Sequence, residues 1–384
     1  MESCDVAIVG GGILGLAHAY AAAKRGQSVV LFERNARAQG ASVRNFGMIW
    51  PIGLHEEILQ LGLRSAEIWR EVLDEAGLPY APTGSLHLVY RGDEEAVVRE
   101  FADLAPARGY RCQWIDREET LARSAAAVPD GLRGALWSET ELTVDPRLVV
   151  GELPGYLSEK FDVTCHFSEP VLSVAGGFVE TAQRKLQAQR VIVSSGIDFE
   201  TLYPHEFARE PLKKCKLQMM RTAPQPEGWK LGPALAAGLT LRFYPAFRIC
   251  STLGALERRI EDETPEYNRW GIHVMVSETA LNEMTLGDSH EYDLALEAFD
   301  KPEIDELVLR YLRGFARFPN EAIAQRWHGV YANHPTKRTL ELEPEPGVHI
   351  AMVTGGKGMT LSFGYAESLA RVLNARSQSG GLSE

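Results

Sequence analysis

The residues that decide the fold stand at the start of the chain, Asp5-Val6-Ala7-Ile8-Val9-Gly10-Gly11-Gly12-Ile13-Leu14-Gly15. An apolar strand leads directly into Gly10-x-Gly12-x-x-Gly15, and residues 16–24 are compatible with a helix. Gly10 permits the tight turn, Gly12 lets the backbone approach a pyrophosphate, and Gly15 lets helix and strand pack closely. Free N–H groups at the helix start attract phosphate. The pattern predicts a dinucleotide site.

A second strand supports this interpretation. Residues 28–32 are mainly apolar and end on Glu33, which follows the glycines by about twenty residues. A carboxylate at this place can accept hydrogen bonds from a ribose diol. Because strand, glycine turn, helix and acid occur together, we prefer a dinucleotide site to a plain glycine turn in an ordinary α/β domain.

Composition limits the possible classes of protein. The chain has 384 residues, more than one hydrophobic core usually supports, so we expect two domains. The net charge of −12 disfavours nucleic acid or anionic membranes as partners. Five scattered cysteines without a CxxC pair argue against a disulfide framework and against a metal site. With no secretory signal and no apolar run of about 18 residues, we expect a cytoplasmic protein without a membrane span.

The far end of the chain repeats the opening pattern. A buried strand over 348–353 leads into Thr354-Gly355-Gly356-Lys357-Gly358-Met359-Thr360, and a helix is expected over 363–376. Between about 212 and 323 the pattern changes to recurring strand-like segments with one charged helix. The expected class is α/β (α+β), with a Rossmann-like domain and an inserted antiparallel-sheet domain for the substrate. The first domain comprises residues 1–80, 145–210 and 325–384, and the second comprises 81–144 and 211–324.

Several motifs occur in an order that is similar to one known family. They are Gly10-x-Gly12-x-x-Gly15 with Glu33, Gly40-Ala41-Ser42-x-Arg44-Asn45-x-Gly47, Thr83-Gly84-Ser85-Leu86, Val144-Asp145-Pro146, Ser194-Ser195-Gly196 and Thr354-Gly355-Gly356-x-Gly358-Met359-Thr360. The set resembles the D-amino-acid oxidase, glycine oxidase and sarcosine oxidase family of FAD-dependent oxidoreductases, over nearly the whole chain. Within it, residues 44–51 resemble a subgroup associated with bacterial phosphonate degradation.

The resemblance implies FAD as the cofactor. Ser42, Arg44, Asn45 and Gly47 would line the pyrophosphate and the flavin edge, and Val171 would bind the adenine through its backbone. Lys357 would add positive charge beside the flavin or remain a solvated lysine in a glycine turn. The expected cofactor contacts are Gly10, Gly12, Ile13, Leu14, Gly15, Glu33, Arg34, Ser42, Arg44, Asn45, Gly47, Val171, Ser195, Gly196, Gly355, Gly356, Lys357, Gly358, Met359 and Thr360.

The flavin is expected to be non-covalent. Family members with covalent flavin attach it near the C-terminal motif or in the stretch that corresponds to residues 44–50, and neither place has a suitable cysteine or histidine here. His55 and His18 are the nearest alternatives, and His18 is expected to pack in the first helix. No second dinucleotide motif is visible, so electrons are expected to leave to O2 or to another acceptor.

The resemblance implies oxidation of an amine. Hydride would move from the carbon beside the nitrogen to flavin N5, and the imine would hydrolyse to an aldehyde or keto product. This chemistry needs orientation and a neutral amine more than a strong base, so we name no catalytic base.

The sequence departs from the family where amino-acid oxidases hold the substrate carboxylate. The family pattern W-x-G-x-R-P is replaced by Trp327-His328-Gly329-Val330-Tyr331, so that Tyr331 stands in the arginine place. The loss of a bidentate clamp argues against α-amino acids and favours an aminophosphonate such as 2-aminoethylphosphonate or its N-methyl derivative. Arg242 and Tyr244, expected on one face of a strand, are substrate candidates, with Lys337, Arg338, Tyr331 and Trp50.

Two alternatives stay open. One is an oxidase of the glycine, sarcosine or D-amino-acid type that uses Lys337, Arg338 or Arg242 for a carboxylate. The other is a non-catalytic FAD-binding subunit or redox sensor, which would bind FAD without being reduced by any amine.

Overall fold

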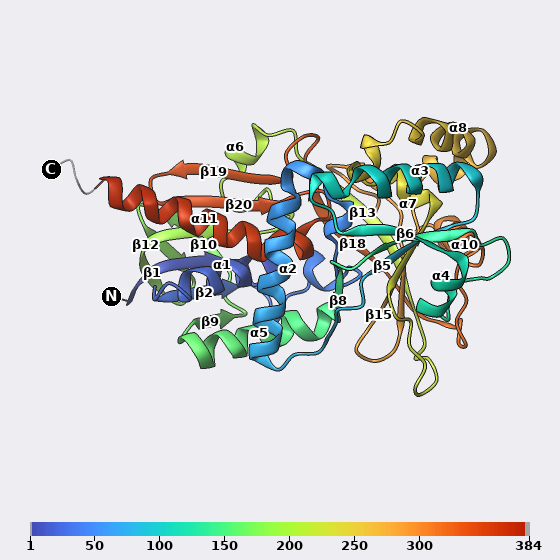
Figure 1. The fold of residues 1–384 in the computed structure, drawn as a ribbon. Helices are drawn as coiled ribbons and strands as arrows, with labels where there is room; N and C mark the ends of the chain where they lie inside the picture. The colour runs from blue at the N-terminus through green and yellow to red at the C-terminus, as the bar shows by residue number, and fades with distance from the viewer. Residues whose placement is uncertain (1, 381–384) are drawn as a thin grey trace.

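The computed structural model describes residues 2–380, and two large sheets dominate it (Figure 1). The first has eight strands in the order β10-β11-β12-β1-β2-β9, with β20 beside β12 and β19 beside β20. β1 runs parallel to β2 and β12, so Val9, Phe32 and Val193 reach the same edge. Carboxyl ends of parallel strands form the ligand-binding edge of open α/β sheets. The strands are β1 (Glu2–Val9), β2 (Val29–Glu33), β9 (Thr164–Phe167), β10 (Val171–Ala175), β11 (Phe178–Thr181), β12 (Lys185–Val193), β19 (Thr339–Glu345) and β20 (Val348–Val353).

Within residues 2–380, four long helices and one short one accompany this sheet. α1 is buried almost all round, because α11 and α5 pack against it in addition to the sheet. α2 ends at Gly77, whose φ of 63° is the left-handed conformation of a helix cap, and α5 begins after Asp145, which accepts a hydrogen bond from the Arg147 amide. A glycine in the left-handed conformation thus ends α2, and a side-chain cap begins α5. The helices are α1 (Ile13–Ala23), α2 (Glu56–Ala76), α5 (Pro146–Phe161), α6 (Pro204–Ala208) and α11 (Gly358–Gly380).

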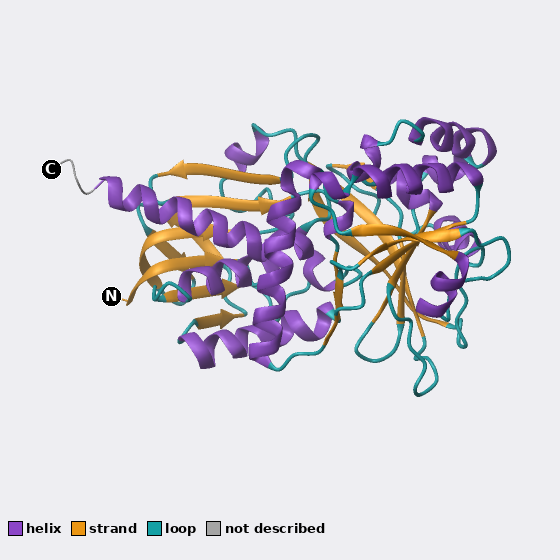
Figure 2. Ribbon diagram, in the orientation of Figure 1, coloured by secondary structure: helices purple, strands orange, loops and turns teal. Residues whose placement is uncertain are grey.

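The second sheet has nine strands in the order β17-β13-β16-β15-β14-β5-β7-β6, with β18 also paired to β13. Its pairs are antiparallel except for β5 with β14. Figure 2 shows helices gathered on this sheet at the opposite end of the molecule from the chain termini. The strands are β5 (Ser85–Val89), β6 (Cys112–Asp116), β7 (Gly134–Ser138), β13 (Lys213–Thr222), β14 (Ala234–Ala237), β15 (Met275–Glu278), β16 (Met284–Gly287), β17 (Glu291–Asp293) and β18 (Ile323–Asn333). The helices are α3 (Gly92–Leu104), α4 (Arg117–Arg123), α7 (Gly238–Phe243), α8 (Leu253–Glu263), α9 (Pro265–Arg269) and α10 (Pro302–Leu312).

A small third sheet joins the two large parts. It has the order β3-β8-β4, with β3 (Met48–Ile49), β8 (Leu142–Val144) and β4 (Tyr80–Ala81). The Val144 amide donates to the Gly47 carbonyl at 2.9 Å. This hydrogen bond ties the loop that ends at Gly47 to the third sheet.

The α/β class with parallel and antiparallel sheets is confirmed. Two local expectations differ from the structure. Residues 323–333 form β18 and pair with β13, although the sequence interpretation placed residues from 325 onward in the first domain. The segment 239–245, expected to be strand-like with Arg242 and Tyr244 on one face, instead contains most of the helix α7 (Gly238–Phe243), which ends just before Tyr244. Within residues 2–380, no helix is long and apolar enough to cross a membrane.

Candidate functional site

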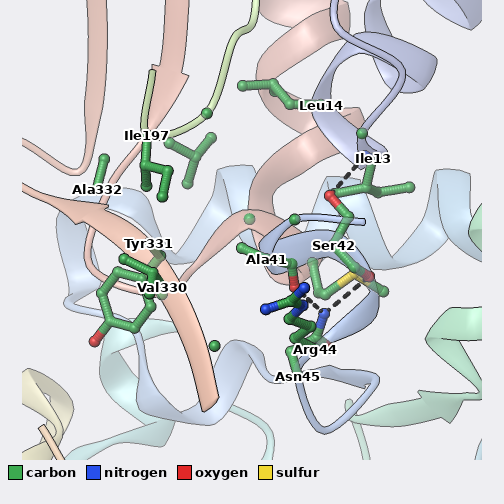
Figure 3. A pocket seen from close by; sticks show the side chains of 18 of the residues that line it. Ile13, Leu14, Ala41, Ser42, Arg44, Asn45, Ile197, Val330, Tyr331 and Ala332 are labelled. Atoms are coloured by element: carbon green, nitrogen blue, oxygen red, sulfur yellow. Dashed lines mark hydrogen bonds between the residues drawn. The ribbon is translucent and has the colours of Figure 1, made fainter. Parts of the chain in front are cut away.

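One cavity of about 520 Å³ runs from the carboxyl edge of the first sheet to the second sheet. All the residues expected to contact the cofactor line it, except Gly15 and Gly47. Figure 3 shows Ser42, Arg44 and Asn45 on one side of this cavity and Tyr331 and Ala332 on the other. Segments from both ends of the chain therefore meet around a single space.

Gly15 and Gly47 act behind the cavity wall. A Cβ on Gly15 would collide with the Gly10 carbonyl oxygen, so this glycine permits close packing of α1 on the turn, as its motif predicts. A Cβ on Gly47 would collide with the Val144 carbonyl oxygen. Both glycines shape the wall without lining it.

The start of α1 fits a phosphate group. Its cap residue is Gly12, which has no side chain to bond the first amides, and its first turn contains no acidic residue. The Ile13 amide donates to Ser42 Oγ at 2.9 Å, and a Cβ on Gly12 would approach that same Oγ to 2.9 Å. The cradle is thus bare backbone with a positive helix end, the arrangement that binds pyrophosphate.

Glu33 is fixed at the end of β2. Its Oε2 accepts from the Gly11 amide at 2.8 Å, and its Oε1 accepts from the Asn35 amide and side chain, each at 2.9 Å. A carboxylate oxygen can accept more than one hydrogen bond, so these contacts orient the group and leave capacity for ribose hydroxyls.

The C-terminal glycine turn brings a second helix end to the same cavity. Gly355 and Gly356 have φ of 67° and 70°, which a side chain would disfavour, and α11 begins at Gly358. The Thr360 hydroxyl accepts from the Trp50 amide at 2.9 Å and fixes the start of α11 against the loop after β3. Lys357 is half-buried, and burial, with a smaller effect of Arg338, lowers the pKa of its amine to about 8.

We call the part of the cavity around Lys357 the chamber. Trp50, Tyr244, His273, Asp288, His290, Tyr331 and Lys357 line it. Ring contacts connect its wall: Tyr244 lies 5.6 Å from His273, and His290 lies 6.4 Å from Tyr331, between centroids. Burial raises the pKa values of Tyr244 and Tyr331, so both are neutral phenols near neutral pH. The indole Nε1 of Trp50 is buried and has no hydrogen-bond partner among the described residues, so it can donate to a ligand.

The sequence interpretation missed His273, Asp288 and His290. These three side chains are buried, line the chamber, and place one ligand atom each within 4.8 Å of the others. Asp288 and His290 stand two residues apart in an extended segment, and this spacing was the one available signal that they share a face. His273 reaches them because its backbone pairs with Asp288, the Asp288 amide donating to the His273 carbonyl at 2.8 Å.

Three of the expected substrate residues lie elsewhere. Arg242 does not share a strand face with Tyr244: it lies on α7 and donates to Asn268 Oδ1 and to the carbonyls of Leu239 and Ile272. Lys337 is half-exposed and pairs with Glu210 at 3.0 Å. Arg338 donates to the His334 carbonyl. None of the three lines the cavity, whereas Trp50, Tyr244 and Tyr331 do.

The alternative sites for flavin attachment are also outside the cavity. His18 is buried in α1 beside Tyr365, and burial lowers the pKa of its imidazole to about 3. His55 caps α2 by accepting a hydrogen bond from the Glu57 amide. None of the five cysteines lines the cavity.

Comparison with known proteins gives consistent similarities. Residues 5–372 match the family described as "FAD dependent oxidoreductase". A subunit of the opine oxidase of Agrobacterium tumefaciens is 24% identical over 256 residues, covering 62% of this chain and 68% of that protein. Glycine oxidase of Geobacillus kaustophilus is 25% identical over 211 residues, covering 50% of this chain and 54% of that protein. The structure of L-proline dehydrogenase from P. horikoshii superimposes with a TM-score of 0.76 at 18% identity, covering 97% of this chain and 93% of that one.

Proposed function

The chain belongs to the FAD-dependent oxidoreductase family, and from this premise we propose that it oxidises the C–N bond of a small amine bearing an anionic group. FAD is its cofactor, as the resemblance implied. For the substrate we propose an aminophosphonate, such as 2-aminoethylphosphonate or its N-methyl derivative. The product is the imine, which hydrolyses in water to an aldehyde or keto compound.

The cavity fits this cofactor because glycine cradles and two helix N-termini line one continuous space. We propose that Gly12, Ile13 and Ser42 hold the pyrophosphate and that Glu33 holds the adenosine ribose. When bound, FAD supplies the hydride acceptor for amine oxidation. Non-covalent binding is supported because no cysteine lines the cavity and the two histidines that do, His273 and His290, lie beside Asp288.

The observation that carries the proposal is the charge of the chamber. Lys357 has no carboxylate within 4.0 Å among the described residues, whereas Arg34, another basic residue that lines the cavity, pairs with Asp198 at 2.7 Å. A half-buried ammonium without a counter-ion is costly, and an anionic ligand would compensate it. We therefore propose that Lys357 binds the anion of the substrate, with the Trp50 indole N–H as a second donor.

The wall of the chamber suits a compact substrate. Tyr331 stands at the place where the family pattern has arginine, and its ring lies over Gly356. A neutral phenol donates one hydrogen bond and does not form the bidentate clamp that guanidinium forms with a carboxylate. A lysine and single N–H or O–H donors suit the three oxygens of a phosphonate. Tyr244, Tyr331 and Trp50 would also orient the amine and exclude water from it.

An oxidase of the glycine or sarcosine type is the second candidate. The similarity to glycine oxidase and to the opine oxidase protein favours a carboxylate-bearing amine, for which Lys357 would be the anion partner in place of Arg242, Lys337 or Arg338. A non-catalytic FAD-binding subunit is the third, and it predicts that no amine reduces the flavin.

Anaerobic reduction of the bound flavin separates these candidates. The purified yellow protein is mixed with 2-aminoethylphosphonate, its N-methyl derivative, glycine, sarcosine and D-alanine, and loss of flavin absorbance is followed. We expect the aminophosphonates to bleach the flavin fastest. Faster reduction by glycine, sarcosine or D-alanine would support the second candidate, and no reduction by any amine would reject amine oxidation.

A further inference from the structure

The side chains of Asp288, His273 and His290 form a group of acceptors that face one another in the chamber. Nε2 of His273 lies 3.2 Å from Oδ1 of Asp288, and Nε2 of His290 lies 4.0 Å from Oδ2. Asp288 Oδ1 is buried and has no hydrogen-bond donor among the described residues. A buried carboxylate oxygen without a donor is unfavourable, so the site calls for a ligand that donates.

The tautomer of His290 shows that a second acceptor beside Asp288 also lacks a donor. Its Nδ1 lies 2.9 Å from the Gly271 carbonyl oxygen, which can only accept, so Nδ1 carries the proton. Burial lowers the pKa of His290 to about 4, so near neutral pH the ring is neutral and Nε2 presents a lone pair towards Asp288. The 4.0 Å separation is too long for a direct hydrogen bond. Two acceptors without donors call for a partner with at least two donor hydrogens, such as an ammonium group.

We propose that Asp288 and His290 bind the ammonium group of the substrate and that Asp288 takes one proton from it. His273, whose Nε2 lies 3.2 Å from Asp288 Oδ1, is assigned as a positioning residue that packs beside the carboxyl group. Its ring is fixed by Phe243, which stacks on it with centroids 3.9 Å apart. This inference rests on the proposed function, because it assigns the amine half of the same substrate whose anion Lys357 binds.

The proton transfer balances without another reactant. One N–H bond of the ammonium breaks, its electron pair stays on nitrogen, and an O–H bond forms on Asp288. An ion pair thereby becomes a neutral amine and a neutral acid, a change that burial favours because desolvation penalises charged forms. Burial raises the pKa of Asp288 well above its usual range, in agreement with this role. The neutral amine then carries the lone pair that C–N oxidation requires.

Neighbouring charges favour an ammonium over a metal ion. Two imidazoles and a carboxylate can hold a divalent cation, but Lys357 and Arg242 both act on His273 and His290, where they disfavour added positive charge. Their repulsion of a dication would be twice that of an ammonium at the same place. The titratable and charged groups that face the three side chains are Lys357, Arg242, Tyr244, Tyr331, Tyr292, Cys215 and His87.

The test compares ligands that differ only in the amine. Dissociation constants of the FAD-loaded protein are measured by flavin difference spectra for 2-aminoethylphosphonate against ethylphosphonate, and for glycine against acetate. Titrations of the reactive amines use dithionite-reduced protein, which cannot turn over. We expect the amine to improve wild-type affinity about tenfold or more, and Asp288→Asn to abolish this preference while ethylphosphonate affinity stays within about threefold.

One control variant and one second test variant keep the outcome decisive. Asp293→Asn makes the same change in an exposed residue of β17 outside the cavity and should keep the wild-type preference. His290→Gln is a second variant in case Asp288→Asn fails to fold, and it should also reduce the preference. Equal preference in wild type and in folded variants, or a stoichiometric metal ion whose removal by EDTA abolishes ligand binding, would overturn the inference. Wild-type flavin that no amine bleaches would instead reject the proposed function, and the inference with it.

Discussion

Lys357 and Asp288 give the chamber one basic and one acidic group, which we propose bind the two ends of a zwitterionic substrate. Both line the chamber. Burial lowers the pKa of the Lys357 amine and raises the pKa of the Asp288 carboxyl group. An opposite charge beside each group offsets the burial that destabilises its charged form, so binding of a zwitterion and charging of these two groups favour each other. The specificity of the enzyme is therefore expected to depend on these two side chains.

Replacing Lys357 by Met removes the cation and keeps most of the side-chain length. We expect the dissociation constant of ethylphosphonate to rise about tenfold or more, since a charge-assisted hydrogen bond contributes about 1.5–3 kcal/mol. Flavin difference spectra measure this directly. Lys337→Met is the matched control, because Lys337 pairs with Glu210 outside the cavity and its loss should change nothing. Equal affinity in Lys357→Met and wild type would contradict the assignment of Lys357.

The pH dependence of anion binding should follow the same side chain. Lys357 is cationic below its pKa of about 8 and loses its charge as the pH rises through that value. His290, with a pKa lowered to about 4, stays neutral throughout this range. Affinity for ethanesulfonate, an anion that does not titrate here, should be constant at lower pH and fall above about pH 8. A flat profile, or one that rises with pH, would contradict this prediction.

At the scale of elements, we propose that the helix N-termini position the cofactor and that the strands position the residues that bind the substrate. α1 and α11 both begin at glycine-lined turns and both present amides to one cavity. The segments beside β15 and β16 bring His273 and Asp288 together through backbone pairing. Each proposed functional group thus lies at or next to the end of a helix or strand.

Gly12→Val tests the start of α1. The added side chain would fill the bare cradle and approach Ser42 Oγ, which can move, so the fold should persist while pyrophosphate binding is lost. We expect the flavin content per protein, measured by the ratio of absorbance at the flavin and protein bands, to fall to a small fraction. Gly151→Val, at a position of α5 with open space around it, should keep full flavin content. Full flavin content in Gly12→Val would refute the cradle.

Asp145→Ala tests the start of α5. Burial opposes the charge of Asp145, but hydrogen bonds from Arg147 prevail and lower its pKa. The charged cap therefore stabilises the fold above the unfolded pKa of about 4 and ceases to do so as the pH falls through the lower folded value. At neutral pH we expect a loss of about 1–2 kcal/mol in unfolding free energy. Urea denaturation should show this difference between wild type and variant shrinking at acidic pH; a constant difference would contradict it.

At the scale of the whole molecule, local patterns predicted more than long-range ones did. The glycine turns, the caps at Gly77 and Asp145 and the α/β class follow from neighbouring residues, so the sequence was sufficient for them. The error at residues 238–243 arose because a six-residue segment alternating apolar and polar fits a strand or one turn of helix equally well. His273 and Asp288 meet only because β15 pairs with β16, and sequence periodicity does not encode which strands become neighbours.

The cavity lies between two sheets. A cofactor bound there should contact both sheets and raise the free energy of unfolding of the whole protein. A ligand that binds only the folded state stabilises it by about 2.7 kcal/mol at a hundredfold excess over its dissociation constant. We expect acid precipitation to release all the flavin into the supernatant, because attachment is non-covalent. The apoprotein should melt several degrees below the FAD-loaded protein, and added FAD should restore both the melting temperature and the yellow colour. Flavin that stays with the acid-precipitated protein would show covalent attachment. An apoprotein that melts at the same temperature as the loaded protein would show that bound FAD does not stabilise the whole protein.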